Sequence, residues 1–125
     1  MQRYWDRIAD RIFDIDEKIR YVGIVDASYH VIVSRMRSGI SSLTSSELDW
    51  NFVSIVPRTM VEGALRLEGT CGPLEIMSIR YRKVMLSLYR AGDYIVTVSF
   101  EPTVETPFMQ KLTQELSRIL YYERE

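Results

Sequence analysis

The chain has few residues of the types that catalyse reactions or bind metals. His30 is its only histidine and Cys71 its only cysteine. A histidine general base works with a nucleophile and an orienting carboxylate, and the sequence around His30 supplies no such set. Asp26 and Ser28 lie nearby, but a hairpin turn favours such polar residues, so we interpret them as turn residues. A metal site needs several His, Cys or carboxylate ligands together. We therefore predict no catalytic residue, no metal site and no cofactor.

Three other features of the sequence could have a chemical role, but each also has a structural interpretation. Cys71 stands in a glycine-rich loop and is either an exposed reactive thiol or, more commonly, incidental. Glu101 and Glu105 flank prolines and are expected to cap the last helix. No G-x-x-x-x-G-K-[ST] motif is present, so the chain is not a P-loop nucleotidase. A basic cluster can meet an acidic partner, although a solvated strand end is the commoner explanation; it comprises Arg80, Arg82, Lys83 and Arg90.

The composition is that of an ordinary globular domain. The 125 residues suit one domain, residues 1–125, and 16 basic against 17 acidic residues give a net charge of -1. This balance disfavours nucleic acid as a partner. A single cysteine is typical of a reducing compartment. There is no apolar run of about 20 residues, and the mixed charges of the N-terminal residues lead us to expect no signal peptide. We expect a soluble cytoplasmic protein that binds no nucleic acid and no membrane.

Residues 73–100 predict three antiparallel strands, over 74–82, 84–89 and 94–100. Apolar residues alternate along each run, and the sequence from Arg90 to Asp93 indicates a tight turn around Gly92. The second and third strands are apolar on both faces, which is typical of the middle of a sheet covered by helices. The first ends in Arg80, Tyr81, Arg82 and Lys83. Because such charge suits a sheet edge, we place this strand outermost.

The rest of the chain predicts one hairpin and three helices. Residues 20–37 form the hairpin, which turns near residues 27–29, and its polar second strand suits the other edge. Helical spacing of apolar residues predicts a first helix over 2–18, which covers the core or, as the alternative, pairs with a partner helix. Capping boxes at Thr44 and Ser46 open a second helix over about 47–68, whose expected apolar side includes Ile55, Met60 and Leu67. In it we expect a kink or break at 53–56, just before Pro57, and a C-terminal cap at Gly69. The last helix starts at 105–107.

These elements follow one another as α-β-β-α-β-β-β-α. Strands that are apolar on both faces belong in the middle, so the expected sheet order is 2-1-5-4-3. The middle helix then covers one face and the terminal helices the other. The fold class is α/β in the α+β sense, a three-layer α/β/α sandwich around a five-stranded antiparallel sheet.

This element order resembles the roadblock/LC7 fold, a relative of profilin-like and longin domains. The hairpin IRYVGIVDASYHVIVSRMRSGI and the meander GPLEIMSIRYRKVMLSLYRAGDYIVTVSFEP are similar to a family of small archaeal roadblock-like proteins. The resemblance implies a non-enzymatic homodimer that joins outer strands and middle helices, and a scaffold or regulator of a partner such as a small GTPase. On this chain the implied interface is Leu74, Ile76, Met77, Ile79, Tyr81, Phe52 and Val56.

The residues of the 74–82 strand favour the same surface. Its start is more apolar than a free edge usually is, and unpaired edges invite pairing. The competing interpretation is that these side chains face the helices. A second function class is a small-ligand sensor of the profilin-like type, in which small side chains leave room between sheet and helix: Gly23, Ser34, Ser78 and Ser87.

Overall fold

The computed structural model describes residues 2–41, 52–102 and 106–122. The ordered elements are α1 (Gln2–Phe13), β1 (Ile19–Val25), β2 (Val31–Met36), the π-helical turn η1 (Pro57–Val61), α3 (Glu62–Leu65), α4 (Glu68–Cys71), β3 (Ile76–Arg80), β4 (Met85–Ala91), β5 (Tyr94–Phe100) and α5 (Thr106–Tyr122). Residues 52–56 are α-helical and lead directly into η1.

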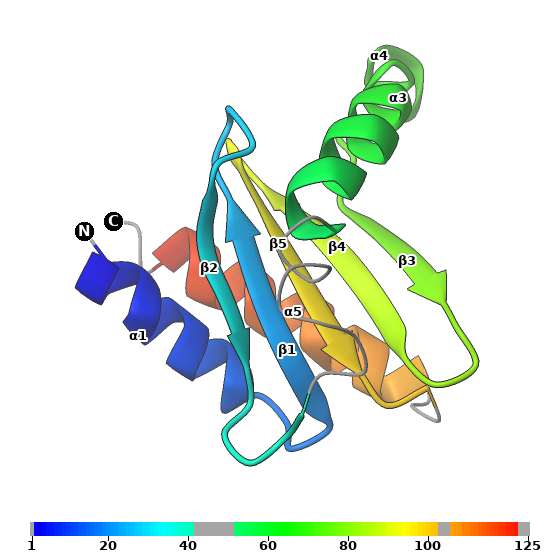
Figure 1. The fold of residues 1–125 in the computed structure, drawn as a ribbon. Coiled ribbons are helices and arrows are strands. Elements are labelled where there is room, and N and C mark those ends of the chain that lie inside the picture. The colour runs from blue at the N-terminus through cyan, green and yellow to red at the C-terminus, as the bar shows by residue number, and fades with distance from the viewer. Residues whose placement is uncertain (1, 42–51, 103–105, 123–125) are drawn as a thin grey trace.

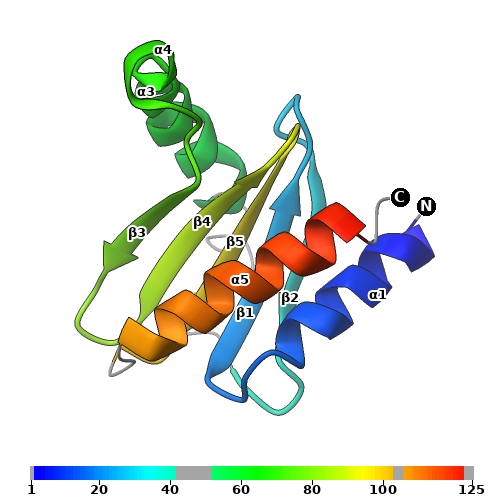
Figure 2. The ribbon, with the colours of Figure 1, turned by 180° about the vertical axis from the view of Figure 1, so that it is seen from behind.

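The five strands form one antiparallel sheet in the order β2-β1-β5-β4-β3. Figures 1 and 2 show α1 and α5 side by side across one face, and the helical segment from residue 52 onward against the other. The predicted three-layer α+β architecture, element order and sheet order are therefore confirmed. β3 is an edge strand of this sheet, with β4 as its one neighbour.

Each face of the sheet has its own apolar core. The larger core joins α1 and α5 to the sheet around Ile12, Phe100 and Leu116, all three of which are completely buried. The smaller core lies under the middle helical segment and joins Val53 and Val61 to Leu88 and neighbouring strand residues. The buried stripe of α1 shows that this helix covers the core, as the first interpretation of its spacing predicted.

Helix α1 ends at Phe13, five residues earlier than the predicted residue 18. The chain then turns into β1, and the guanidinium of Arg37 donates hydrogen bonds to the carbonyls of Phe13, Asp16 and Ile19, each at 2.7 Å. The same guanidinium lies over the Phe13 ring, 5.2 Å from its centre. The arginine that follows β2 thus satisfies the Phe13 carbonyl at the end of α1 and ties the connection and the start of β1 to it.

The middle helix continues through Pro57 without the predicted break. Residues 52–56 are α-helical, and the hydrogen-bond pattern becomes π-helical from Pro57 to Val61 before α3 begins. Proline has no N–H to donate to the carbonyl four residues earlier, and a π-helical turn shifts the pairing by one residue. The Thr59 hydroxyl also donates to the Ile55 carbonyl, at 2.9 Å.

The C-terminal cap of this helical segment was assigned to the wrong glycine. Gly69 lies inside α4, whereas Gly72 follows α4 with a φ of 90°. With a φ of 90° and a ψ of 177°, Gly72 has a conformation that glycine adopts far more readily than other residues, and it ends the segment. The predicted capping boxes at Thr44 and Ser46, and Glu105, lie outside the described residues. The turns at residues 27–29 and at Gly92 are confirmed by positive φ at Tyr29 and Gly92.

Candidate protein interface at the edge of the sheet

His30 and Asp26 form the turn between β1 and β2. The Asp26 carboxylate accepts hydrogen bonds from the backbone N–H of Ser28 and of His30, at 2.9 and 3.0 Å. Partial burial alone would raise the pKa of Asp26, but these two N–H groups and the neighbouring His30 side chain lower that pKa below its usual value. The His30 side chain is 79% exposed, and its Nδ1 lies 3.4 Å from the carboxylate. The pair therefore shapes the turn, as predicted for turn residues.

The other candidate chemical groups do not come together. Cys71 is an exposed free thiol in α4. Within residues 2–41, 52–102 and 106–122, no three His, Cys, Asp or Glu side chains are grouped so that they could hold a metal ion. No helix in those ranges is both long enough and apolar enough to cross a bilayer. Glu101 forms an ion pair with Arg20 at 3.3 Å.

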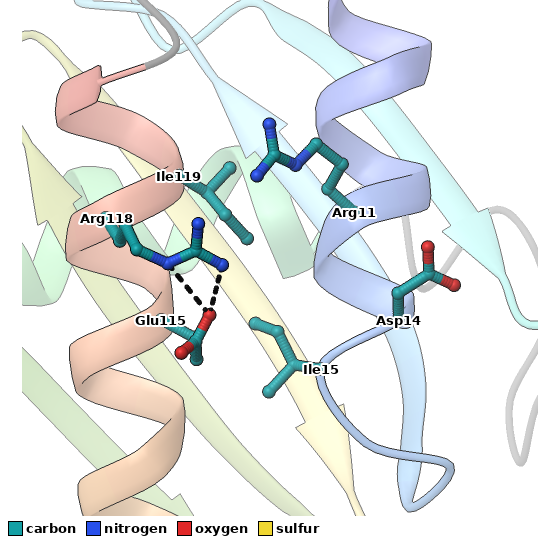
Figure 3. Close-up of a pocket in the computed structure, with 6 residues that line it drawn as sticks. All are labelled: Arg11, Asp14, Ile15, Glu115, Arg118 and Ile119. Carbon is teal, nitrogen blue, oxygen red and sulfur yellow. Dashed lines mark hydrogen bonds and ion pairs between the residues drawn. The ribbon is translucent and has the colours of Figure 1, made fainter.

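A hollow of about 220 Å³ lies between α1 and α5 (Figure 3). Ile15 and Ile119 line it together with two acidic and two basic side chains, from Arg11, Asp14, Glu115 and Arg118. Arg118 is bonded to Glu115 at 2.6 Å. Because the hollow is open and its charges balance, it offers no selective attraction for an ion.

The four small residues proposed to leave room for a ligand lie on opposite faces of the sheet. Gly23 and Ser34 are register partners on the middle-helix face, and Ser78 and Ser87 are partners on the other face. Val53 fills the space above Gly23, where an added Cβ would lie 2.4 Å from Val53 Cγ2. The serines are bonded as well: Ser34 to the Tyr21 hydroxyl at 2.7 Å, and Ser78 to Ser87 at 3.1 Å. They do not form a common pocket.

Among the residues that the structure describes, the backbone of β3 is paired on one side only. Next to the strand, the Arg90 N–H donates to the Glu75 carbonyl and the Tyr81 N–H to the Val84 carbonyl. In an antiparallel ladder the hydrogen-bonded residues alternate, so 77 and 79 also pair toward β4. The N–H and C=O groups of Ile76, Ser78 and Arg80 therefore point away from the sheet. They form an open row of donors and acceptors.

The predicted interface residues are distributed over two faces of this edge. Leu74, Met77, Ile79 and Val56 are half-buried and pack against the smaller core. Ile76 is half-buried on the opposite face, because it alternates with Met77 along the strand. Phe52 is half-buried on the middle helical segment. Tyr81 is 52% exposed at the end of β3.

Sequence reasoning missed the exposed apolar side chains of the middle segment. Ile55, Met60 and Leu67 are 58%, 40% and 62% exposed, whereas Val53, Pro57 and Val61 face the core. The helical spacing had assigned Ile55, Met60 and Leu67 to the buried side, which is wrong. The sequence did show that the apolar residues of this segment lie on more than one side of a helix. A helix that is apolar on several sides needs a second partner to cover the side turned away from its own core.

The predicted basic cluster separates into two parts. Arg90 lies at the far end of β4 and forms an ion pair with Glu68 at 2.7 Å. Arg80, Arg82 and Lys83 are exposed at the β3–β4 turn, and no ion pair to them occurs within the described ranges. The open edge therefore ends in three positive charges, and it begins next to the exposed Glu75.

This architecture is the roadblock/LC7 fold. No family model matches the sequence, and no curated protein matches it. Among solved structures, the chain is similar to Myxococcus xanthus MglB (17% identity, 98% of this chain and 91% of that one, TM-score 0.66). It is also similar to the gliding protein MglB of Thermus thermophilus (13%, 95% and 92%, TM-score 0.65) and to a Roadblock/LC7 domain from Streptomyces avermitilis (8%, 89% and 89%, TM-score 0.64). At these identities the likeness establishes the fold.

Proposed function

We propose that this protein is a non-enzymatic interaction module: a homodimer of the roadblock type that scaffolds or regulates a protein partner such as a small GTPase. The observation that supports the proposal most is the open edge of β3. Its outward groups at Ile76, Ser78 and Arg80 have no partner strand in the sheet, and such an edge favours pairing with another strand.

The apolar surface beside this edge supports the same proposal. Ile55 and Met60 are exposed on the middle helical segment, which lies on the sheet face toward β4 and β3 (Figure 1). Met77 and Ile79 of β3 are half-buried on the same face of the sheet as this segment. Covering apolar side chains in a second copy removes them from water, at about 25 cal/mol per Å². Edge and helix together give the dimer both hydrogen bonds and apolar contact.

The dimer is tested by blocking the outward donor of Ser78. Ser78→Pro removes an N–H that faces away from β4, and an edge strand tolerates proline at such a position. The matched control is Ser34→Pro on β2, the other edge strand, because each change also removes one hydroxyl–hydroxyl hydrogen bond. By sedimentation at about 50 μM, wild type and Ser34→Pro should be dimers and Ser78→Pro a monomer. A monomeric wild type, or a dimeric Ser78→Pro protein, contradicts the proposal.

The partner is tested by enzyme kinetics. Small GTPases from the source organism are loaded with GTP, and hydrolysis or nucleotide release is measured with and without this protein. The regulator proposal predicts a rate change with at least one GTPase that Ser78→Pro abolishes. Unchanged rates with every GTPase, together with no complex by sedimentation, contradict the GTPase part and leave the dimer standing.

A further inference from the structure

We propose that the middle helical segment, residues 52–71, is a separately opening layer: it lifts from the sheet while the sheet, α1 and α5 stay folded, and a partner that covers its outer side closes it. Such a layer is a conformational switch, because the same segment carries exposed apolar side chains and covers one face of the sheet. The inference goes beyond the proposed function. Only its last step, closure by a second copy, rests on the proposed homodimer.

The segment buries few side chains against the sheet. Over residues 52–71 only Val53, Pro57 and Val61 are buried, and Figures 1 and 2 show α3 and α4 extending past the end of the sheet. Helix α5 buries larger side chains, among them the completely buried Leu112 and Leu116. Because hydrophobic stabilisation grows with the apolar area removed from water, the smaller core holds its helix less strongly than the larger core holds α5.

The sheet face under the segment is polar for a buried surface. Val53 packs on Gly23, which pairs with Thr97 of β5, and the Tyr21 and Ser34 hydroxyls beside them are bonded to each other. Thr97 is completely buried, and its hydroxyl has no hydrogen-bond partner within the part of the chain that the structure describes. Burying such a hydroxyl is unfavourable. Lifting the segment lets water reach Thr97, so this residue favours the open layer.

The C-terminal end of the segment is tied to the sheet by the Glu68 carboxylate. It accepts hydrogen bonds from Arg90 Nη1 and from the Leu74 N–H, both at 2.7 Å. The Glu68 and Arg90 side chains are 27% and 33% exposed, and an ion pair that water reaches stabilises little. Gly72 follows α4 directly, and glycine adopts backbone conformations that other residues avoid. The chain can therefore change direction there when the tie opens.

The outer side of the layer connects its opening to partner binding. Ile55 and Met60 are exposed on that side. In the proposed homodimer the second copy contacts them together with the β3 edge, which requires the layer to lie on the sheet. A partner that binds one of two states shifts the population toward that state. Covering the outer side therefore closes the layer, and a closed layer binds the partner more tightly.

Hydrogen exchange followed by mass spectrometry tests the opening in the Ser78→Pro protein at about 1 μM, where no second copy covers the segment. The protection factor of peptide 57–67 should be at least about 100-fold lower than that of peptide 108–120 in α5. In urea below the unfolding transition it should change little, because lifting the layer exposes less surface than global unfolding. Equal protection, or an equally steep urea dependence, in the two peptides overturns the separate opening.

Thr97→Val distinguishes a layer that lifts from a helix that only frays. Valine has the shape of threonine without the hydroxyl, so the open layer no longer gains from hydrating residue 97. The protection factor of peptide 57–67 should rise by about tenfold. The matched control is Thr113→Val in α5, whose hydroxyl donates to the Met109 carbonyl at 3.0 Å, and it should leave that peptide unchanged. An unchanged peptide 57–67 in Thr97→Val, or the same rise in Thr113→Val, overturns the proposal.

Closure by a second copy is tested by comparing the wild type with Ser78→Pro at about 50 μM. The wild type should protect peptide 57–67 at least about tenfold more, and in Ser78→Pro this protection should not depend on protein concentration. Equal protection in a wild type that sediments as a dimer overturns closure by the partner. A monomeric wild type contradicts the homodimer instead, and the Thr97→Val comparison then decides the opening by itself.

Discussion

Gly23 holds the middle helix close to the sheet, and replacing it by alanine tests that contact. A Cβ at this position would lie 2.4 Å from Val53 Cγ2 and 2.9 Å from the Tyr21 hydroxyl oxygen. Carbon atoms pack best at about 3.5–4.0 Å, so Val53 would have to move by roughly 1 Å. Val53 is completely buried, and such overpacking costs about 1–3 kcal/mol.

The alanine also brings a gain, because glycine inside a strand costs about 0.5–1 kcal/mol relative to alanine. We therefore expect Gly23→Ala to lower the free energy of unfolding by about 1–2 kcal/mol. In urea at fixed protein concentration, the midpoint should fall by about 0.5–1 M. The matched control is Gly63→Ala in α3, where an added Cβ has no neighbour within 4 Å. That change should stabilise the protein by about 0.5–1 kcal/mol.

Val53→Ala completes a double-mutant cycle. Alone it should destabilise the protein through the cavity it leaves, but in the Gly23→Ala background it removes the methyl group that clashes. The coupling between the two changes should be about 1 kcal/mol or more. A Gly23→Ala protein as stable as wild type, or two changes that simply add, would refute the close contact between helix and sheet.

Three further predictions concern turns and caps. Arg37→Met should lower the free energy of unfolding by about 2–3 kcal/mol, measured in urea, because three carbonyls lose a charged donor; an unchanged value would refute this role. Gly72→Ala should lower the free energy of unfolding by about 1–2 kcal/mol, since its φ is 90°. Gly69→Ala lies inside α4 with open space around it, so it should raise the free energy of unfolding by about 0.5–1 kcal/mol; equal effects would contradict the cap assignment. The pKa of Asp26 is lowered from 3.8 in the folded protein, so its stabilisation is present above that value and is lost as pH falls through the lower folded pKa. Asp26→Asn should therefore make the free energy of unfolding depend less on pH below about pH 4. An unchanged pH dependence would argue against the turn contacts.

The architecture could be predicted because the spacing of apolar residues along a strand or helix indicates which of its faces are buried. Strands that are apolar on both faces, such as β5, had to lie in the middle, and a strand ending in Arg80 had to lie at the edge. The order of the sheet follows from those two facts. The tight turn at Gly92 could also be predicted, because such a turn needs a residue that tolerates positive φ, and Gly92 has one.

The orientation of the middle helix could not be predicted in the same way. Val53, Pro57 and Val61 face the core at spacings of four. Apolar residues occur on more than one side of this helix, so the helical period alone did not determine which side faces the sheet. An ideal helix had placed Ile55 and Met60 there instead. The exposed part of the candidate interface therefore became visible only in the structure.

The alternation of backbone groups along β3 was also beyond the sequence. Which residues point outward depends on how the strand pairs with β4, and that register is a tertiary feature. Sequence reasoning placed Ile76, Met77 and Ile79 in one interface. The structure adds that, of these three, only Ile76 directs its N–H and C=O away from β4.

The central claim is that the outward groups of β3 pair with a second copy, and residue-resolved hydrogen exchange tests it most directly. The amides of Met77 and Ile79 bond to β4 within one chain, so they should exchange slowly at every protein concentration. The amides of Ile76, Ser78 and Arg80 should be protected at about 500 μM and lose protection on dilution, because only the dimer pairs them. Rapid exchange of those three amides at every concentration, beside slow exchange at Met77 and Ile79, would contradict the account.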